Sequence, residues 1–222
     1  MSDLLVLHAL GDPEGGAPWA GAFRAAGWPG AVHTPDLPGH AGREPPLGGG
    51  YHRADPALFG ALVLAEGAVE SAVVVGVGPS GWGAELLALG SRAVALVLVD
   101  GLGGPWLDAP AAVEAERAWV RRLADDPAAL APAPAGGRLD PRLGHGVPGQ
   151  TDRGLALRAA GAVSVPVLVV ETAGPGPALL SPGETEEVVA AFPAAELVRL
   201  EGASPAAVAD AVTKWAAVTL PA

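Results

Sequence analysis

The residues of this chain that could do chemistry cluster at one turn, between residues 76 and 82. The valines at 73–75 form a continuous β-branched run, which is typical of a strand in the middle of a parallel sheet that is covered on both faces. Small and turn-forming residues follow, and a leucine-rich segment then indicates a helix. A strand, a sharp turn and a helix in this order can present a serine nucleophile, in the pattern G-x-S-x-G. Ser80 is the serine of this turn and our first candidate catalytic residue.

Two registers can place the apex of the turn. In the first, Gly78 is the apex, which is sterically sound but supplies no nucleophile. Pro79 then follows the apex, and proline has no N–H to donate to an oxyanion. In the second, Ser80 is the apex and Gly81 the donor, but the bulky Trp82 comes two residues after the apex. We favour the glycine apex, because proline prefers the first position of a helix and Pro79 therefore marks the helix start.

Further candidates lie near the ends of expected strands. Asp100 directly follows an apolar run, on the side of a parallel sheet where ligands bind, and it either serves a site or organises its own turn. Trp82 and Trp106 also follow strand ends, and they either wall an apolar pocket or pack in the core. The backbone N–H groups of Ser80 and Gly81, at a helix start, could hold a carboxylate or a phosphate.

Apolar and amphipathic segments alternate along the chain. Besides the run at 73–75, apolar runs predict strands at 4–8, 31–36, 93–99, 165–170 and 196–200. Helices are expected between these strands and after the last one. The helix that starts at Asp55 and Pro56 is expected to bury Leu58, Leu62, Ala65 and Val69. The pattern predicts an α/β fold with a mostly parallel central sheet and helices on both faces.

Composition narrows the classes of partner and cofactor. The 222 residues fit a single domain, residues 1–222, and the net charge of −11 argues against nucleic acid or an anionic membrane as partner. The chain has no cysteine, which excludes disulfides and zinc–thiolate sites, and no metal-ligand spacing is present. No cofactor is therefore expected. The chain has no signal-like segment and no apolar run near 18 residues, so we expect a cytoplasmic protein. The sequence predicts no particular oligomeric state.

Three segments in order resemble the N-terminal half of an α/β-hydrolase. His8 ends the first apolar strand, the sequence PDLPGH at 35–40 follows the next one, and the glycine-rich turn comes third. The resemblance implies that the loop with His8 and Leu10 helps to form an oxyanion hole. Two positions depart from the family pattern, because Ala9 and Ala41 stand where glycine is usual.

The same resemblance implies a triad whose parts are hard to find here. The family takes its acid after either of two late strands, which points to Asp100 or Glu171. It places its histidine base after the last strand, but this chain goes from Glu201 directly into a helix near Pro205, and all five histidines precede residue 146. A short cap insertion is expected at about 104–162, and His145 is its one histidine.

Several functions remain open at this point. The favoured hypothesis is a non-hydrolytic or catalytically impaired relative that binds a small ligand at the C-terminal ends of the strands. The first alternative is a carboxylic-ester hydrolase that uses Ser80, Asp100 and either His145 or His8. The second is dinucleotide binding through the G-x-G-x-x-G match at 76–81, with Asp100 about 20 positions on. The third is a scaffold protein without a small ligand.

Overall fold

The structure is a computed structural model of the 222-residue chain. It describes residues 2–9, 12, 14–44, 51–90, 92–102, 104, 106, 108–125, 139–140, 142–143, 152–172, 182–202 and 204–221. Within these residues, six strands form one sheet in the order β2-β1-β3-β4-β5-β6, and each neighbouring pair runs parallel. The strands are β1 (Asp3–Leu7), β2 (Val32–His33), β3 (Ala72–Val77), β4 (Ala93–Val99), β5 (Val167–Thr172) and β6 (Ala195–Leu200).

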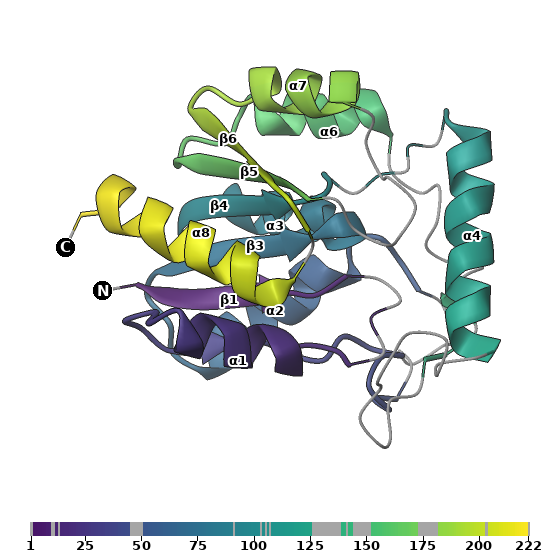
Figure 1. Ribbon diagram of the computed structural model, residues 1–222, viewed down its shortest axis with the longest axis horizontal. Helices are drawn as coiled ribbons and strands as arrows, with labels where there is room; N and C mark the ends of the chain where they lie inside the picture. Colours follow the sequence, from purple (N-terminus) through teal and green to yellow (C-terminus); the bar gives the residue numbers. More distant parts are fainter. Residues whose placement is uncertain are drawn as a thin grey trace.

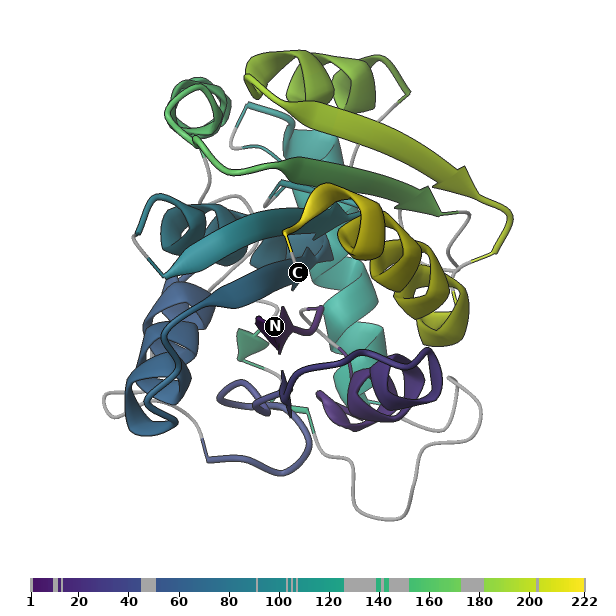
Figure 2. The same ribbon diagram turned by 90° about the vertical axis from the view of Figure 1, so that its left-hand side faces the viewer.

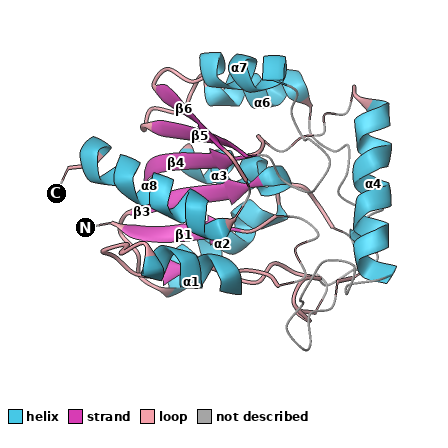
Figure 3. Cartoon of the chain, in the orientation of Figure 1, coloured by secondary structure: helices cyan, strands magenta, loops and turns pink. Residues whose placement is uncertain are grey.

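Helices cover both faces of this sheet (Figures 1 and 2). On one face pack α1 (Ala17–Ala25) and α8 (Pro205–Thr219), whose Phe23 and Val212 are fully buried. On the other face pack α2 (Asp55–Glu66), α3 (Gly81–Ala88), α6 (Arg153–Ala160) and α7 (Pro182–Ala191). Figure 3 shows the resulting three layers, with the strands between the helices. The expected α/β class with helices on both faces is confirmed.

The central strands are buried on both sides. All six residues of β3 are buried, and its side chains alternate between the two apolar clusters: Val74 faces α3, whereas Val73 and Val75 face the layer of α1 and α8. A strand that is buried on both faces needs apolar side chains at every position, so its sequence is an unbroken apolar run.

Helix α2 buries a different face from the expected one. Gly60 and Leu64 pack inward, whereas Leu58 and Leu62 are 60% and 46% exposed. The helix is apolar around most of its circumference, so hydrophobic periodicity does not tell which face packs. Gly60 decides the matter, because a Cβ at this position would lie 2.6 Å from Cδ1 of Leu87 in α3. The two helices therefore meet at the glycine.

The strand order places a crevice at one end of the sheet. From β1 the chain moves to β2 on one side and then to β3 on the other, and ligands in such sheets bind outside the carboxyl ends at this switch point. Helix α4 (Pro110–Asp125) lies across these carboxyl ends (Figure 1). Helix α6, although inside the expected cap insertion, belongs to the layer on the sheet. In the described part of the chain, no helix has the length and apolar character needed to cross a membrane.

Candidate functional site

The turn between β3 and α3 has Gly78 at its apex. The strand ends at Val77, Gly78 takes a φ of +54°, and a 3-10 turn (Gly78–Ser80) leads directly into α3. A left-handed φ is readily adopted by glycine and costs other residues energy. The geometry follows the first of the two registers, so Ser80 lies two residues after the apex.

Two further glycines allow the helix to cross close to the strands. A Cβ on Gly76 would lie 2.6 Å from the Cβ of Ala84, and one on Gly81 would lie 2.2 Å from the carbonyl oxygen of Gly101. Real Cβ atoms do not approach other atoms so closely, so the spacing of the glycines is set by packing. The glycine-rich motif therefore has a structural explanation.

Ser80 is buried, and its hydroxyl is already engaged. Its Oγ donates to the carbonyl oxygen of His8 at 2.6 Å, and its exposed fraction is 2%. No imidazole among the described residues accepts this proton. The hydrogen bond ties the turn after β3 to the end of β1, which is a structural role.

Two buried histidines stand beside this turn. Nδ1 of His8 lies 3.0 Å from the carbonyl oxygen of Ala9, while Nε2 accepts from the backbone N–H of Leu37 at 3.0 Å, so Nδ1 carries the proton. The ring of His40 packs edge-on against it, with centroids 4.9 Å apart. Burial lowers the pKa of His8 to about 4 and that of His40 to about 3. Both rings are neutral at pH 7, and His8 holds the 37–40 loop in place.

One of the two backbone donors expected at this turn, the N–H of Gly81, is taken. Pro79 has no N–H, and the N–H of Gly81 donates to the carbonyl oxygen of Gly78 within the 3-10 turn. The expectation that Gly81 offers a free N–H to an anion is therefore wrong, because the helix begins with a 3-10 turn that uses it.

Asp100 points toward β5 and binds its end. One carboxylate oxygen accepts from the N–H of Thr172 and the other from its hydroxyl, both at 2.6 Å. Asp100 itself has a φ of +58°, an uncommon conformation for a residue with a side chain. Burial raises the pKa of Asp100, and the two bonds from Thr172 oppose that rise. The structure does not bring this carboxylate to the hydroxyl of Ser80, whose bond is to His8.

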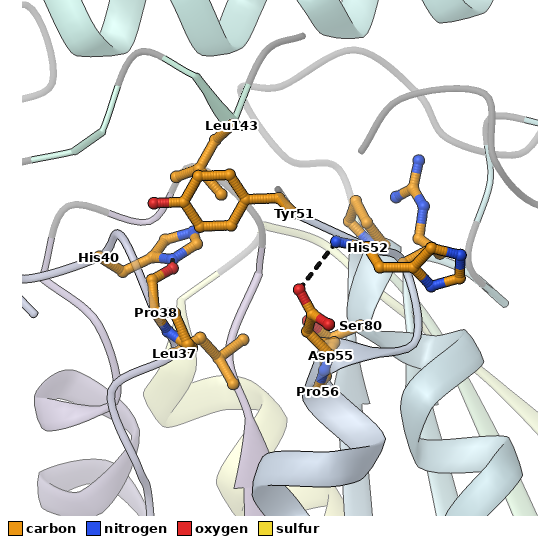
Figure 4. Close-up of a pocket in the computed structure, with 11 residues that line it drawn as sticks. Leu37, Pro38, His40, Tyr51, His52, Asp55, Pro56, Ser80 and Leu143 are labelled. Atoms are coloured by element: carbon orange, nitrogen blue, oxygen red, sulfur yellow. Dashed lines mark hydrogen bonds between the residues drawn. The ribbon is translucent and has the colours of Figure 1, made fainter. Parts of the chain in front are cut away.

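A pocket lies above the turn, between loops from four parts of the chain (Figure 4). The cavity has a volume of about 30 Å³, which is enough for about two water molecules. The described residues that line it are Leu37, Pro38, His40, Tyr51, His52, Arg53, Asp55, Pro56, Pro79, Ser80 and Leu143. The exposed part of this lining is mostly apolar, although six of the eleven residues have polar side chains.

The start of α2 forms one wall of the pocket, and two hydrogen bonds fix the residues at that start. The backbone N–H of His52 donates to Oδ2 of Asp55 at 2.7 Å, and Nδ1 of His52 accepts from the N–H of Ala54 at 3.1 Å. Both contacts satisfy backbone N–H groups that precede the helix, whose first residue is Asp55. Asp55 and His52 are therefore held in fixed positions at the pocket.

Two polar contacts join the pocket to the segment above it. Tyr51 donates its hydroxyl proton to Asp140 at 2.8 Å, and Arg142 holds the pKa of Asp140 at about 2. Arg53 forms a buried ion pair with Glu116 of α4 at 3.1 Å. Burial raises the pKa of Glu116, and the guanidinium beside it opposes that rise. These two contacts connect Asp140 and Glu116 to the pocket residues Tyr51 and Arg53.

The other candidates lie away from this pocket. Trp82 and Trp106, expected as pocket walls, are 9% and 2% exposed and pack in the core cluster on the α3 face of the sheet. An indole ring has a large apolar surface to bury, and in both residues this surface packs in the core instead of the pocket. Leu10 and His145 lie outside the described residues. In the described ranges, no group of three or more His, Asp or Glu side chains could hold a metal ion.

Solved structures with the same architecture were found across the whole chain. A hydrolase from Pseudomonas aeruginosa is 22% identical over 100% of this chain and 90% of its own, with a TM-score of 0.73. A thermophilic esterase from Thermogutta terrifontis is 21% identical over 100% and 91%, with a TM-score of 0.73. An enol-lactonase from Burkholderia xenovorans is 18% identical over 99% and 91%, with a TM-score of 0.71. This chain has the α/β-hydrolase fold. No family model and no curated protein sequence matches it.

The α/β-hydrolase fold places its nucleophile at the apex of the strand-to-helix turn. In this chain Gly78 occupies the apex, and Ser80 reaches the pocket from the position two residues later. His8, Gly78 and Gly81 support the turn and its neighbours without lining the pocket. Of the sequence-derived site residues that the structure describes, only Ser80 lines it.

Tyr51, His52 and Asp55 are pocket residues that sequence reasoning missed. Tyr51 and His52 follow a glycine-rich stretch and belong to no chemical motif, so no local signal marks them. In the sequence, Asp55 marks only the start of a helix. The loop at 37–40 carries a family resemblance, and its position after β2 is the signal that could identify it as pocket-lining.

Proposed function

We propose that this α/β-hydrolase-fold protein is non-hydrolytic and binds a small ligand in the pocket above the β3–α3 turn. The observation that carries the proposal is the turn itself. Its apex is Gly78, which has no side chain to attack a substrate, and Pro79 has no N–H for an oxyanion. Loss of the nucleophile and of one oxyanion donor at a single turn removes most of the acceleration that such a site gives.

The surroundings of Ser80 support the same proposal. Its proton goes to a backbone carbonyl oxygen instead of a base, and Asp100 is engaged with Thr172. A serine hydroxyl without a base is a weak nucleophile. After β6 the chain enters α8 at Pro205, and the connection contains no histidine.

Dinucleotide binding has less support than small-ligand binding. In that fingerprint the acidic residue hydrogen-bonds a ribose and the first helical N–H groups face the pyrophosphate. Here both carboxylate oxygens of Asp100 accept from Thr172, and the N–H of Gly81 is used within its own turn. The turn also follows the third strand of the chain instead of the first.

A fluorophosphonate probe, which labels activated serines, tests the absence of hydrolytic chemistry. We expect no labelling of the wild-type protein or of the Ser80→Ala variant, in parallel with an active serine esterase as positive control. Stoichiometric labelling of the wild type that disappears in Ser80→Ala would establish the esterase alternative. The free energy of unfolding of the Ser80→Ala variant should be about 1 kcal/mol lower than that of the wild type, because the carbonyl oxygen of His8 loses its buried donor.

Ligand binding is tested by NMR titration with n-butanol, a small neutral molecule with an apolar body. We expect shifts confined to the amides of pocket residues such as Tyr51, His52 and Ser80. The variant Leu143→Phe, which adds volume at the pocket wall, should weaken these shifts, whereas Val218→Phe, at an 85% exposed position of α8, should not. An absence of saturable shifts in the wild type would contradict the ligand-binding half of the proposal.

A further inference from the structure

His8 connects the end of β1 to two parts of the pocket. Its carbonyl oxygen accepts from Oγ of Ser80 at 2.6 Å, and Nε2 of its ring accepts from the N–H of Leu37 at 3.0 Å. The ring also packs edge-on against His40. Ser80, Leu37 and His40 line the pocket, whereas His8 is fully buried and does not line it. One residue thus holds one wall of the pocket beside the β3–α3 turn.

The wall that His8 holds is the loop at 37–40 (Figure 4). Its backbone is bonded to the segment above the pocket, where the N–H of Asp140 donates to the carbonyl oxygen of Gly39 at 2.8 Å. Among the described residues, the bond from Leu37 is the backbone hydrogen bond of this loop that reaches the end of β1. Loss of that bond would free the wall on the side of the sheet.

The bond from Leu37 requires a neutral ring. Nδ1 of His8 carries the proton that it donates to the carbonyl oxygen of Ala9 at 3.0 Å, so the lone pair on Nε2 is the acceptor. A proton taken from solvent at Nε2 leaves a ring with two N–H groups and no lone pair. Nε2–H would then face the N–H of Leu37, and two donors do not bond. Protonation of His8 and the observed position of the loop therefore exclude each other.

The closed wall resists protonation because the ring is buried. Burial lowers the pKa of His8 from 6.5 to about 4, and a charge on His8 also lowers the pKa of His40. The charge of Asp36 raises the pKa of His40, but the effect of burial is larger. Asp36 itself accepts from the N–H of Gly16 at 3.0 Å. No carboxylate in the described part of the chain accepts from the ring of His8, so a charge there has no counterion.

Other titratable groups near the two histidines have to be separated from them. Asp12, in the loop before α1, interacts with Asp36, and burial raises the pKa of Asp12 to about 6. Asp12 therefore takes up a proton in the same range of pH as His8. The β3–α3 turn at 78–81 contributes no ionisable side chain. The remaining neighbours are Glu14 and Arg43 beside the two acids, and Tyr51, His52, Arg53 and Asp55 on the pocket side of His40.

We propose that His8 is a pH-sensitive switch of the pocket: a proton taken up at Nε2 breaks the bond from Leu37 and opens the wall formed by residues 37–40. This rests on the proposed ligand-binding function and names the regulation of that site. The open loop leaves the ring with its ordinary pKa of 6.5, whereas the closed loop holds it at about 4. The open form binds the proton more tightly, so its population increases about tenfold for each unit by which the pH falls between these values.

Native-state hydrogen exchange of the full chain, followed by NMR, measures this opening at the amide of Leu37. After correction for the intrinsic exchange rate, its protection should decrease about a hundredfold from pH 6.5 to pH 4.5. The protection should be the same with and without 1 M urea, since a local opening exposes little surface. The amides of β3 should exchange faster in urea. A urea dependence at Leu37 equal to that of β3 would show that the wall opens only on global unfolding, which overturns the switch.

Variants assign the pH dependence to one residue. His8→Gln keeps an oxygen that can accept from Leu37 and does not titrate, so the protection of Leu37 should no longer depend on pH. His33→Gln removes a histidine that is bonded to Asp3, and Asp12→Asn removes the buried acid but keeps an acceptor oxygen. Both should retain the wild-type slope. A slope that persists in His8→Gln, or that disappears in Asp12→Asn, would overturn the assignment.

The ring itself gives a result even where His8→Gln folds poorly. Nitrogen-15 spectra of the wild-type imidazole at pH 7 should show the proton of His8 on Nδ1 and a lone pair on Nε2. A proton on Nε2 at this pH would overturn the switch, because the acceptor for Leu37 would be missing in the closed form.

Binding of n-butanol connects the switch to the ligand-binding function. At saturation and pH 5, butanol should increase the protection of Leu37, because it binds the closed form. Shifts of pocket amides without such an increase would overturn the regulation of the site. Absence of butanol binding, together with the expected pH slope, would overturn the ligand-binding function and leave the switch standing. An absent slope with intact butanol binding would do the reverse.

Discussion

Glu85 is a charged residue type placed where charge is costly. It is fully buried in α3, one helical turn after Gly81, and neither carboxylate oxygen has a partner in the described part of the structure. Burial raises the pKa of Glu85 from 4.5 to about 8. The side chain is therefore protonated and neutral at pH 7, in keeping with the apolar cluster around α3.

We predict that Glu85 makes the protein less stable as the pH rises. Below pH 4.5 the carboxyl is protonated in both the folded and the unfolded states, so folding has no ionisation penalty. Between pH 4.5 and about 8 the unfolded state loses the proton and the folded state keeps it, which lowers the free energy of unfolding by about 1.4 kcal/mol per pH unit. Above that range the loss is complete. Urea unfolding of Glu85→Gln should show a smaller decrease in stability than the wild type over this range.

The matched control is Glu66→Gln, which changes an exposed glutamate at the end of α2. Its stability should follow the wild-type pH profile throughout. The difference between Glu85→Gln and the wild type should be small at pH 4.5 and largest near pH 9. A constant difference at all pH values would mean that Glu85 finds a proton donor or a cation in the folded protein.

Single residues show where sequence reasoning reaches its limit. The apex at Gly78 was predictable, because the local order of small residues and proline determines how a strand turns into a helix. Asp55 and Tyr51 were not predictable as pocket residues, since their position depends on contacts between distant segments. Tyr51 and its partner Asp140 are 89 positions apart in the chain.

At the scale of elements, the described contacts between helix α4 and the pocket residues include one apolar cluster and one ion pair. Val120 of α4 packs with Tyr51, Leu139 and Leu143 in a small apolar cluster separate from the two large ones. The ion pair between Arg53 and Glu116 is the buried polar contact between α4 and the start of α2, with side chains 1% and 3% exposed. A charge that loses its partner in such surroundings is strongly destabilising.

We predict that Glu116→Gln loosens α4 from the rest of the protein. The guanidinium of Arg53 would stay buried without the charge of Glu116, at a cost of about 3 kcal/mol. Native-state hydrogen exchange should show faster exchange of the α4 amides, and the urea midpoint should decrease. Glu114→Gln breaks the exposed pair with Arg117 in the same helix and should cost under 1 kcal/mol. Equal effects of the two variants would show that burial of the Arg53 pair contributes nothing.

Elements were predictable in type and order, but less so in length and orientation. The strand expected at 31–36 is reduced to β2 (Val32–His33), because the residues after it form the loop that His8 holds. Helices were expected between the strands, and α4 is one of those that lie between β4 and β5. The buried face of α2 was wrongly predicted, since Leu58 and Leu62 are as apolar as the residues that pack.

At the scale of the whole molecule, two apolar clusters on opposite faces of one sheet account for the fold. The apolar runs predicted the central strands, and strands that alternate with helices are joined in parallel by crossovers. The pocket was not predictable in the same way. It lies where the residues after β2 and β3, the start of α2 and Leu143 meet, and no single segment of sequence contains that meeting point.

The balance of charge is also a property of the whole chain, and it makes stability depend on salt. There are 24 acidic and 13 basic residues, a net charge of −11 at pH 7. Like charges repel more strongly in the compact state, and salt screens this repulsion, with a Debye length of about 10 Å at 0.1 M and about 3 Å at 1 M. Surface pairs such as Lys214 with Asp210 weaken under the same screening, but each contributes under about 1 kcal/mol.

We therefore predict that sodium chloride stabilises the folded state at pH 8. A net gain of about 1 kcal/mol would raise Tm by roughly 2–4 °C for a chain of this size. The control is the same titration at pH 4.7, the isoelectric point, where the net charge is zero and the effect should vanish or change sign. Thermal unfolding followed by circular dichroism at low protein concentration measures both. An equal rise of Tm at the two pH values would assign the stabilisation to salting-out of apolar surface, because that effect does not depend on net charge.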